Sequence, residues 1–147
     1  MDIKIIDFQL KYLGEMAKSF VESFDEWDVK TASQYMKQAY LICPDYCFAA
    51  INGDGKVTGA IFCKFGPFGS GKTLIIESLQ IKKEFRNKKI GSALIGAVVK
   101  RAKNNKVPNM SMLASNKKDF PLLWFKNIGF KETGWVELVG EVKKIKI

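Results

Sequence analysis

The central stretch of the chain, residues 77–94, reads ESLQIKKEFRNKKIGSAL. Its first residues continue a β-prone run that extends from Thr73 to Ile81, and a helical pattern follows from about Lys89 to Asn105. A strand that turns directly into a helix leaves several backbone N–H groups exposed at the helix N-terminus, where they bind anions together with the helix dipole. The stretch therefore predicts a strand, an anion-binding turn and a helix.

The charges around this turn favour a phosphorylated ligand. From Lys82 to Lys106 there are nine basic residues and one acid, Glu84, so the local field attracts phosphate. Gly91 removes a side chain at a point where the oxygens of such a ligand would approach the backbone closely. An ordinary strand–helix unit with a solvated lysine face explains the same features, and they do not separate the two interpretations.

The pattern on either side of this stretch predicts helices packed around a mixed sheet. The segment 52–55, NGDG, supplies the residues that a hairpin turn needs between two β-prone runs. Consecutive strands in the middle of the chain, with helices elsewhere, predict an α/β fold with a mixed central sheet flanked by helices. The expected strands are 3–6, 47–51, 57–65, 73–81 and 109–114, with a closing pair split by Gly134 and ending at Ile147, and the expected helices are 10–24, 30–42, 89–105 and 120–127.

Length and composition indicate one globular domain over residues 1–147. The net charge of +9 is a feature of nucleic-acid-binding proteins, but 22 of the 24 basic residues are Lys, whereas sequence-specific readers favour the bidentate Arg fork. Three cysteines without a single histidine favour neither a disulfide framework nor a Cys/His zinc site. No signal-peptide pattern and no apolar run of bilayer length occur, so we expect a soluble, cytoplasmic protein without a metal.

Two segments of the chain resemble motifs of the GNAT superfamily of acetyltransferases. The first is residues 86–91, RNKKIG, which matches the family's Arg/Gln-x-x-Gly-x-Gly/Ala loop for the pyrophosphate of acetyl-CoA. Lys89 stands where the family's first Gly usually occurs, and a Lys in a right-handed helical turn is sterically allowed and could itself reach a phosphate. The second is residues 123–130, LWFKNIGF, which resembles the family's Phe-Tyr-x-x-x-Gly-Phe segment at the thioester end of the cofactor.

The resemblance implies an N-acetyltransferase that moves acetyl from acetyl-CoA to an unidentified primary amine by direct attack. It implies that the acetyl-pantetheine arm lies along the middle strand and pairs with its backbone as an added strand would. A backbone N–H near Ile81 would then polarise the acetyl carbonyl. The cofactor-binding residues implied by the resemblance are Leu79, Gln80, Ile81, Arg86, Asn87, Lys88, Lys89, Ile90, Gly91, Ser92 and Phe125.

Glu77 is the candidate catalytic residue, as the base that removes the proton of the acceptor amine. Strand alternation places it on one face with Ile75, Leu79 and Ile81, where apolar neighbours and loss of solvation would make the carboxylate a stronger base. A glutamate that reaches solvent where the strand splays is the competing interpretation. Phe125 stands where many relatives carry a Tyr that protonates the departing thiolate, and we expect its ring to pack against the pantetheine sulfur.

Other features fit structural roles at least as well as functional ones. Residues 43–47, CPDYC, have too few ligands for a metal and predict a turn. Trp27, Tyr35 and Tyr40 are more typical of helix core than of an aromatic substrate cage. Three acids at Asp25, Glu26 and Asp28 either attract a cationic amine or form a solvated helix end.

Two alternatives to an enzyme stay open at the level of sequence. Lys89 and Phe125 suggest a non-catalytic acyl-CoA-binding domain, and the charge suggests a basic nucleic-acid-binding protein. The expected partner is a small-molecule or peptide amine acceptor, with neither nucleic acid nor membrane. The oligomeric state, monomer or homodimer, also stays open.

Overall fold

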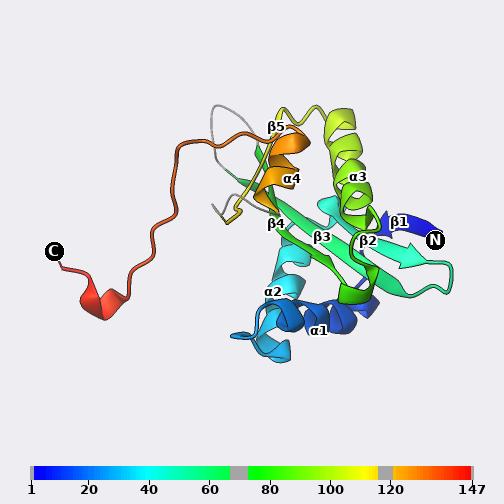
Figure 1. Cartoon of the computed structure of the whole chain (residues 1–147), viewed down its shortest axis with the longest axis horizontal. Coiled ribbons are helices and arrows are strands. Elements are labelled where there is room, and N and C mark those ends of the chain that lie inside the picture. The colour runs from blue at the N-terminus through cyan, green and yellow to red at the C-terminus, as the bar shows by residue number, and fades with distance from the viewer. Residues whose placement is uncertain (1, 67–72, 116–120, 147) are drawn as a thin grey trace. The chain divides into compact units, whose positions relative to one another are not determined.

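The computed structural model describes residues 2–66, 73–115 and 121–146 (Figure 1). The chain divides into two compact units, Met1–Leu113 and Ala114–Ile147, which are described one at a time. The single domain expected over residues 1–147 stays a prediction. Along the described parts of the chain, no helix has both the length and the apolar character needed to span a bilayer.

The first unit contains a five-stranded sheet whose spatial order follows the sequence, β1-β2-β3-β4-β5. Neighbouring strands are antiparallel except for β4 and β5, which are parallel. The turn between β2 and β3 is closed by Asn52, whose side-chain oxygen accepts hydrogen bonds from the Asp54 and Lys56 N–H groups. The mixed sheet and the hairpin are confirmed. The strands are β1 Ile3–Asp7, β2 Cys47–Asn52, β3 Val57–Gly66, β4 Thr73–Ile81 and β5 Asn109–Met112.

Helices cover both faces of this sheet (Figure 1). On one face lie α1, Leu13–Ser23, and α2, Val29–Ile42, and on the other lies α3, Ile90–Asn104. The first face buries a continuous apolar core that supplies most of the stabilisation of the unit. Its fully buried members include Met16, Ala17, Ala32, Met36, Cys47, Ala49, Val57, Ala60 and Phe62.

A β-bulge interrupts the pairing of β4 with β3. Ser78 lies opposite Phe62 and Ile76 lies opposite Cys63, so Glu77 is an extra residue without a partner on β3. Because directly opposite residues share a face, Ser78 points with Phe62 towards α1 and α2, and the bulge turns Glu77 to that side as well. The alternation expected from the sequence is therefore wrong beyond the bulge. Leu79 and Ile81 point to the opposite face, since an added residue reverses the period of two.

The pairing of β4 with β5 is short. The two strands pair from Thr73 opposite Asn109 to Ile76 opposite Met112, and no further pair between them occurs in the described part of the chain. From Glu77 onwards the β5 side of β4 therefore presents main-chain N–H and C=O groups that pair with no strand among the described residues.

The second unit contains one short helix and an extended tail. Helix α4, Leu122–Asn127, is followed by Gly129, whose φ is 116°, and the Phe130 N–H donates back to the Phe125 carbonyl at 3.1 Å. The predicted helix is confirmed over residues 122–127, and its outer end, Phe120, lies outside the described residues.

The predicted closing strand pair is wrong for the described residues 131–146, which contain a 3₁₀ helix, Val142–Lys144, and no strand. The apolar side chains of Trp135, Val136, Leu138 and Val139 are almost fully exposed. An apolar, β-prone composition predicts a strand only where another strand pairs with it, because an isolated hairpin is marginal in water.

Candidate functional site

The strand-to-helix turn predicted at the end of β4 is present. After Ile81 the chain passes through a 3₁₀ helix, Lys83–Phe85, and then enters α3 at Ile90. None of the described side chains caps this helix, and its first backbone hydrogen bond runs from the Ala93 N–H to the Lys89 carbonyl. The N–H groups of the first turn, residues 90–92, precede that bond and point out of the helix end, where an anion binds them together with the helix dipole.

Two residues of the turn have left-handed backbone geometry. Lys89, the residue before the helix, has φ 60° and ψ 14°, and Asn87 has φ 61°. The right-handed conformation expected for Lys89 is therefore wrong. Glycine adopts this geometry without steric cost, which accounts for the Gly that the resembled loop usually carries at this position, whereas Asn tolerates it through local hydrogen bonds.

Gly59 of β3 allows the turn to lie close to the sheet, and no sequence motif pointed to it. A Cβ at this position would lie 2.7 Å from Ile81 Cδ1, 2.9 Å from the Gln80 carbonyl oxygen and 3.4 Å from Ile90 Cγ2. The end of β4 and the start of α3 therefore meet above a backbone with no side chain. A Gly inside a strand is the signal that could have identified this close approach.

The basic residues of the turn have different environments. The Arg86 guanidinium donates to the Ser23 Oγ at 2.8 Å and to the Ile81 carbonyl at 3.2 Å, which joins the turn to the C-terminus of α1. The Lys88 ammonium lies 5.4 Å from the centre of the Phe85 ring. The side chains of Lys88 and Lys89 are exposed. The turn thus presents cations to solvent beside the open end of α3.

Glu77 lies at the bulge of β4 in polar rather than apolar surroundings. Its Oε2 accepts a hydrogen bond of 3.0 Å from the Tyr35 hydroxyl, which also lies 3.3 Å from the Glu77 carbonyl oxygen. Its Oε1 forms an ion pair with Lys64 of β3. The side chain is 21% exposed, so the carboxylate is reachable from solvent. The neighbouring Ser78 hydroxyl is buried and has no hydrogen-bond partner among the described residues.

Burial raises the pKa of the Tyr35 hydroxyl, and the negative charge of Glu77 raises it further. The hydroxyl is therefore a proton donor to Glu77 throughout the neutral range. The Tyr35 ring lies 5.5 Å from Trp27 and 6.0 Å from Phe20, centre to centre. Tyr35 thus contacts the carboxylate as well as packing on the core, and Trp27 packs on the core beside it. Tyr40 packs against Phe8, 5.5 Å away, as expected for a core residue.

The acidic segment between α1 and α2 is in part a helix cap. Asp28 accepts hydrogen bonds from the Thr31 N–H at 2.7 Å and the Thr31 hydroxyl at 3.0 Å. These bonds lower the pKa of the Asp28 carboxyl. Asp25 and Glu26 are exposed. Asp28 therefore has the structural role, and Asp25 and Glu26 add negative charge to this segment.

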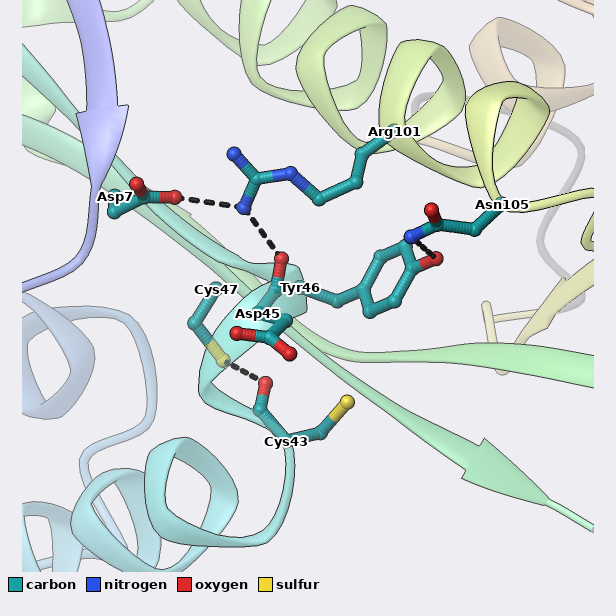
Figure 2. Close-up of polar contacts among 7 residues, drawn as sticks. All are labelled: Asp7, Cys43, Asp45, Tyr46, Cys47, Arg101 and Asn105. Carbon is teal, nitrogen blue, oxygen red and sulfur yellow. Dashed lines mark hydrogen bonds and ion pairs between the residues drawn. The ribbon is translucent and has the colours of Figure 1, made fainter.

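A second polar cluster lies at the other end of α3 (Figure 2). Arg101 donates to the Asp7 carboxylate at 2.7 Å and to the Asp45 carbonyl at 2.6 Å, beside a cavity of about 440 Å³. The Asn105 amide donates to the Tyr46 hydroxyl at 2.8 Å. These contacts join β1, the turn before β2 and α3, so the cluster fastens the sheet to the helix.

The cysteines beside this cluster are structural thiols. Cys47 is buried and its Sγ lies 3.3 Å from the Cys43 carbonyl (Figure 2). Burial raises the pKa of Cys47 to about 12 and also raises the pKa of Cys43. Thiols with raised pKa values are poor nucleophiles at neutral pH. The turn predicted for residues 43–47 is present as a 3₁₀ helix, Pro44–Tyr46.

Phe125 belongs to the second unit. Its ring is buried and lies 4.7 Å from Trp124 and 5.8 Å from Phe130, centre to centre. Its contact with the cofactor stays a prediction.

Comparisons with known proteins give one family and one fold. The model of the acetyltransferase (GNAT) family matches residues 13–130. A solved structure of a transcriptional regulator from Bacillus halodurans has a TM-score of 0.79 at 17% identity and covers 95% of this chain and 100% of its own. A protein from Pyrococcus horikoshii has a TM-score of 0.79 at 23% identity, with 92% and 93% covered.

A third solved structure is an aminoglycoside N-acetyltransferase, AAC(6')-Iy, in complex with a CoA bisubstrate analogue. It has a TM-score of 0.77 at 16% identity and covers 96% of this chain and 99% of its own. No curated protein matches the sequence. At these identities the solved structures establish the fold, and they confirm the mixed sheet flanked by helices.

Proposed function

The chain belongs to the acetyltransferase (GNAT) family, and from this premise we propose that it transfers the acetyl group directly to a primary amine positioned beside Glu77. Family membership makes it an N-acetyltransferase with acetyl-CoA as the acyl donor. The amine acceptor, the site residues and the step that each residue performs belong to the proposal.

The described residues fit acetyl-CoA at two places. The first turn of α3 has no side-chain cap and offers N–H groups to the pyrophosphate, next to Lys88 and Lys89. The edge of β4 from Leu79 to Ile81 has no β5 partner and offers backbone groups to the pantetheine arm. When bound, the cofactor supplies an activated acetyl thioester. AAC(6')-Iy, with the same fold, was solved with a CoA analogue and with CoA, which supports this assignment.

The residues of β4 would carry out the transfer. Glu77 takes a proton from the acceptor ammonium, and the free amine nitrogen then attacks the acetyl carbon. A backbone N–H near Ile81 donates to the carbonyl oxygen as negative charge develops on it. The new C–N bond would form as the C–S bond breaks, and the second proton of the attacking nitrogen would pass to the departing thiolate, directly or through solvent. The supporting observation is the Glu77 carboxylate, partly exposed and hydrogen-bonded by Tyr35, at the point where β4 loses β5 as its partner.

A thermal-shift series with acetyl-CoA, CoA and ATP tests the cofactor assignment. At one hundred times its dissociation constant a ligand stabilises the folded protein by about 2.7 kcal/mol, which raises the Tm of a domain of this size by about 5–10 °C. We expect acetyl-CoA and CoA to give such a shift and ATP to give a smaller one. Equal shifts with all three would indicate a general polyphosphate site instead.

A cytoplasmic location, the absence of a nucleic-acid partner and the choice between monomer and homodimer remain predictions from the sequence. A protein that binds nucleic acid through its lysines would lose affinity steeply with salt, and it would show no saturable response to CoA.

A further inference from the structure

The ion pair between Lys64 and Glu77 places an alkylammonium group on the proposed catalytic carboxylate. Lys64 lies on β3 opposite Ile75, next to the bulge, and its ammonium pairs with Glu77 Oε1. The two side chains are 37% and 21% exposed. A pair at this exposure contributes little to stability, so the Lys64 side chain can leave Glu77 at small cost.

The other oxygen of the carboxylate is already fixed. The Tyr35 hydroxyl donates to Glu77 Oε2 at 3.0 Å, and the Tyr35 ring packs beside Trp27. With Oε2 held by Tyr35, Oε1 has a defined position. A carboxylate oxygen held in this way accepts a charge-assisted hydrogen bond from an alkylammonium ion, as it does from Lys64.

We propose that Lys64 occupies the position of the acceptor ammonium, and that the acceptor is a primary alkylammonium that displaces Lys64 from Glu77 Oε1. This inference rests on the proposed function, because it assigns the acceptor to the same carboxylate. Lys64 presents an ammonium group on a four-carbon chain. A primary alkylammonium acceptor carries the same chemical group. Lys64 is thus a competitor within the chain, and an incoming amine binds only the fraction of molecules in which Lys64 has moved away.

The chemical class of the acceptor follows from this exchange. A ligand must carry a positive charge to replace Lys64, because an uncharged ligand would leave both the carboxylate and the lysine without a partner. n-Butylamine reproduces the lysine side chain, and n-butanol is its neutral counterpart. Nα-acetyl-lysine amide presents the same ammonium on a peptide, so comparing it with n-butylamine distinguishes a free amine from a lysine side chain as the source.

Titration calorimetry of the full chain with these probes, in the absence of acetyl-CoA, tests the proposal. Lys64→Met keeps an unbranched side chain of nearly the same length and removes its charge. We expect n-butylamine or the lysine amide to bind this variant about three- to fivefold more tightly than the wild type, from the loss of an exposed ion pair. Glu77→Gln should lose the binding, and n-butanol should not discriminate among the variants. Lys100→Met, an exposed lysine of α3 on the other face of the sheet, controls for the change in net charge.

Equal or weaker binding of the amines to Lys64→Met, or no binding to either protein, would overturn the proposal. Lys64→Gln repeats the test if the first variant does not fold. A thermal shift with acetyl-CoA, measured on the same samples, separates the outcomes. A shift without the gain in amine affinity rejects the role of Lys64 and leaves the proposed function in place, whereas the loss of the shift in the wild type rejects the proposed function.

Discussion

Tyr35 connects the core of the protein to its candidate catalytic carboxylate. Its ring packs against Phe20 and Trp27, and its hydroxyl donates to Glu77. The same residue therefore contributes to stability and to the position of the carboxylate. Because a hydrogen bond to a charged group is stronger than one between neutral groups, the geometry of Glu77 depends on the Tyr35 proton.

The first prediction concerns the pH dependence of stability. The pKa of Tyr35 is raised from its ordinary value of 10.0 by burial and by Glu77, so the folded protein retains this proton to a higher pH than the unfolded chain does. Its contribution to stability is complete below pH 10 and is lost as the pH rises towards the raised pKa. We expect Tyr35→Phe to unfold about 1 kcal/mol more easily near neutral pH and to lose less stability than the wild type above pH 10.

Urea denaturation at pH values from about 8 to about 11 measures this difference, since pH 10 is the ordinary pKa of tyrosine. Tyr40→Phe, which removes a hydroxyl from a ring that packs against Phe8, is the matched control. Curves for the wild type and Tyr35→Phe that run parallel over the whole range would show that the hydroxyl does not donate to Glu77.

The sequence identified candidate site residues where a motif or a strand pattern pointed to them. It did not predict their backbone conformation. The turn was located from Arg86 and Gly91, yet the left-handed geometry of Lys89 was missed because a lysine gives no local signal for it. Glu77 was singled out from its position in a strand, and the polar neighbours Tyr35 and Lys64 come from sequence positions far from it.

At the scale of elements, the approach of α3 to β4 depends on Gly59. Ile81 at the end of β4 and Ile90 at the start of α3 both lie over this position. The unit formed by β4, the turn and α3 therefore packs at this point against a third element, β3. The turn before α3 is thus connected to the β2–β3 hairpin both at Gly59 and through the hydrogen bond from the Lys82 N–H to the Thr58 carbonyl.

The second prediction is that Gly59→Ala destabilises the protein by about 1–3 kcal/mol, the usual cost of overpacking, and weakens acetyl-CoA binding. A Cβ only 2.9 Å from the Gln80 carbonyl oxygen would displace the backbone of β4. Gly96→Ala is the control, because Gly96 lies in α3 with no atom within 4 Å of a Cβ, and Ala should stabilise the helix there by about 0.5–1 kcal/mol. Chemical denaturation and a calorimetric titration of both variants measure the two effects; a neutral Gly59→Ala would mean that the turn does not depend on this close approach.

The elements themselves were largely predictable, because periodicity and turn residues act locally. The five strands of the sheet and helices α1 to α3 lie close to their expected positions. The bulge at Glu77 was not predictable, since an extra residue on one strand is defined only by the register of its partner. The strand pair expected before Ile147 was wrong for a related reason. The β-prone composition of each segment can be seen in the sequence, but whether the two segments pair with each other cannot.

At the scale of the whole molecule, charge is distributed unevenly along the chain. Residues 1–30 contain seven acids and four lysines, and the remainder contains twenty basic and eight acidic residues. The uneven distribution alone would attract any anion diffusely. Within the described residues, the start of α3 brings the exposed Lys88 and Lys89 next to N–H groups that have no side-chain cap.

The last prediction separates this local site from the diffuse field. Reversing the charge of Arg86 and Lys88 together should weaken acetyl-CoA binding about tenfold or more, whereas reversing Lys143 and Lys144 should weaken it about twofold or less at physiological salt, where exposed charges are screened within about 8 Å. Both double variants change the net charge equally. Lys144 already forms an ion pair with Glu141 at 3.0 Å, so part of its field is neutralised.

Calorimetric titration at two salt concentrations provides the measurement. A local site keeps most of the difference between the two double variants at high salt, because charges in direct contact with the phosphates are screened less than charges farther than the Debye length from them. Because Arg86 also holds Ser23, Ser23→Ala is measured alongside: it removes that contact and leaves the positive charge in place. If the two double variants weaken binding equally, the lysine-rich surface acts as a whole and the phosphate site is misplaced; if Ser23→Ala alone reproduces the loss, Arg86 acts by holding α1 to the turn rather than by binding phosphate.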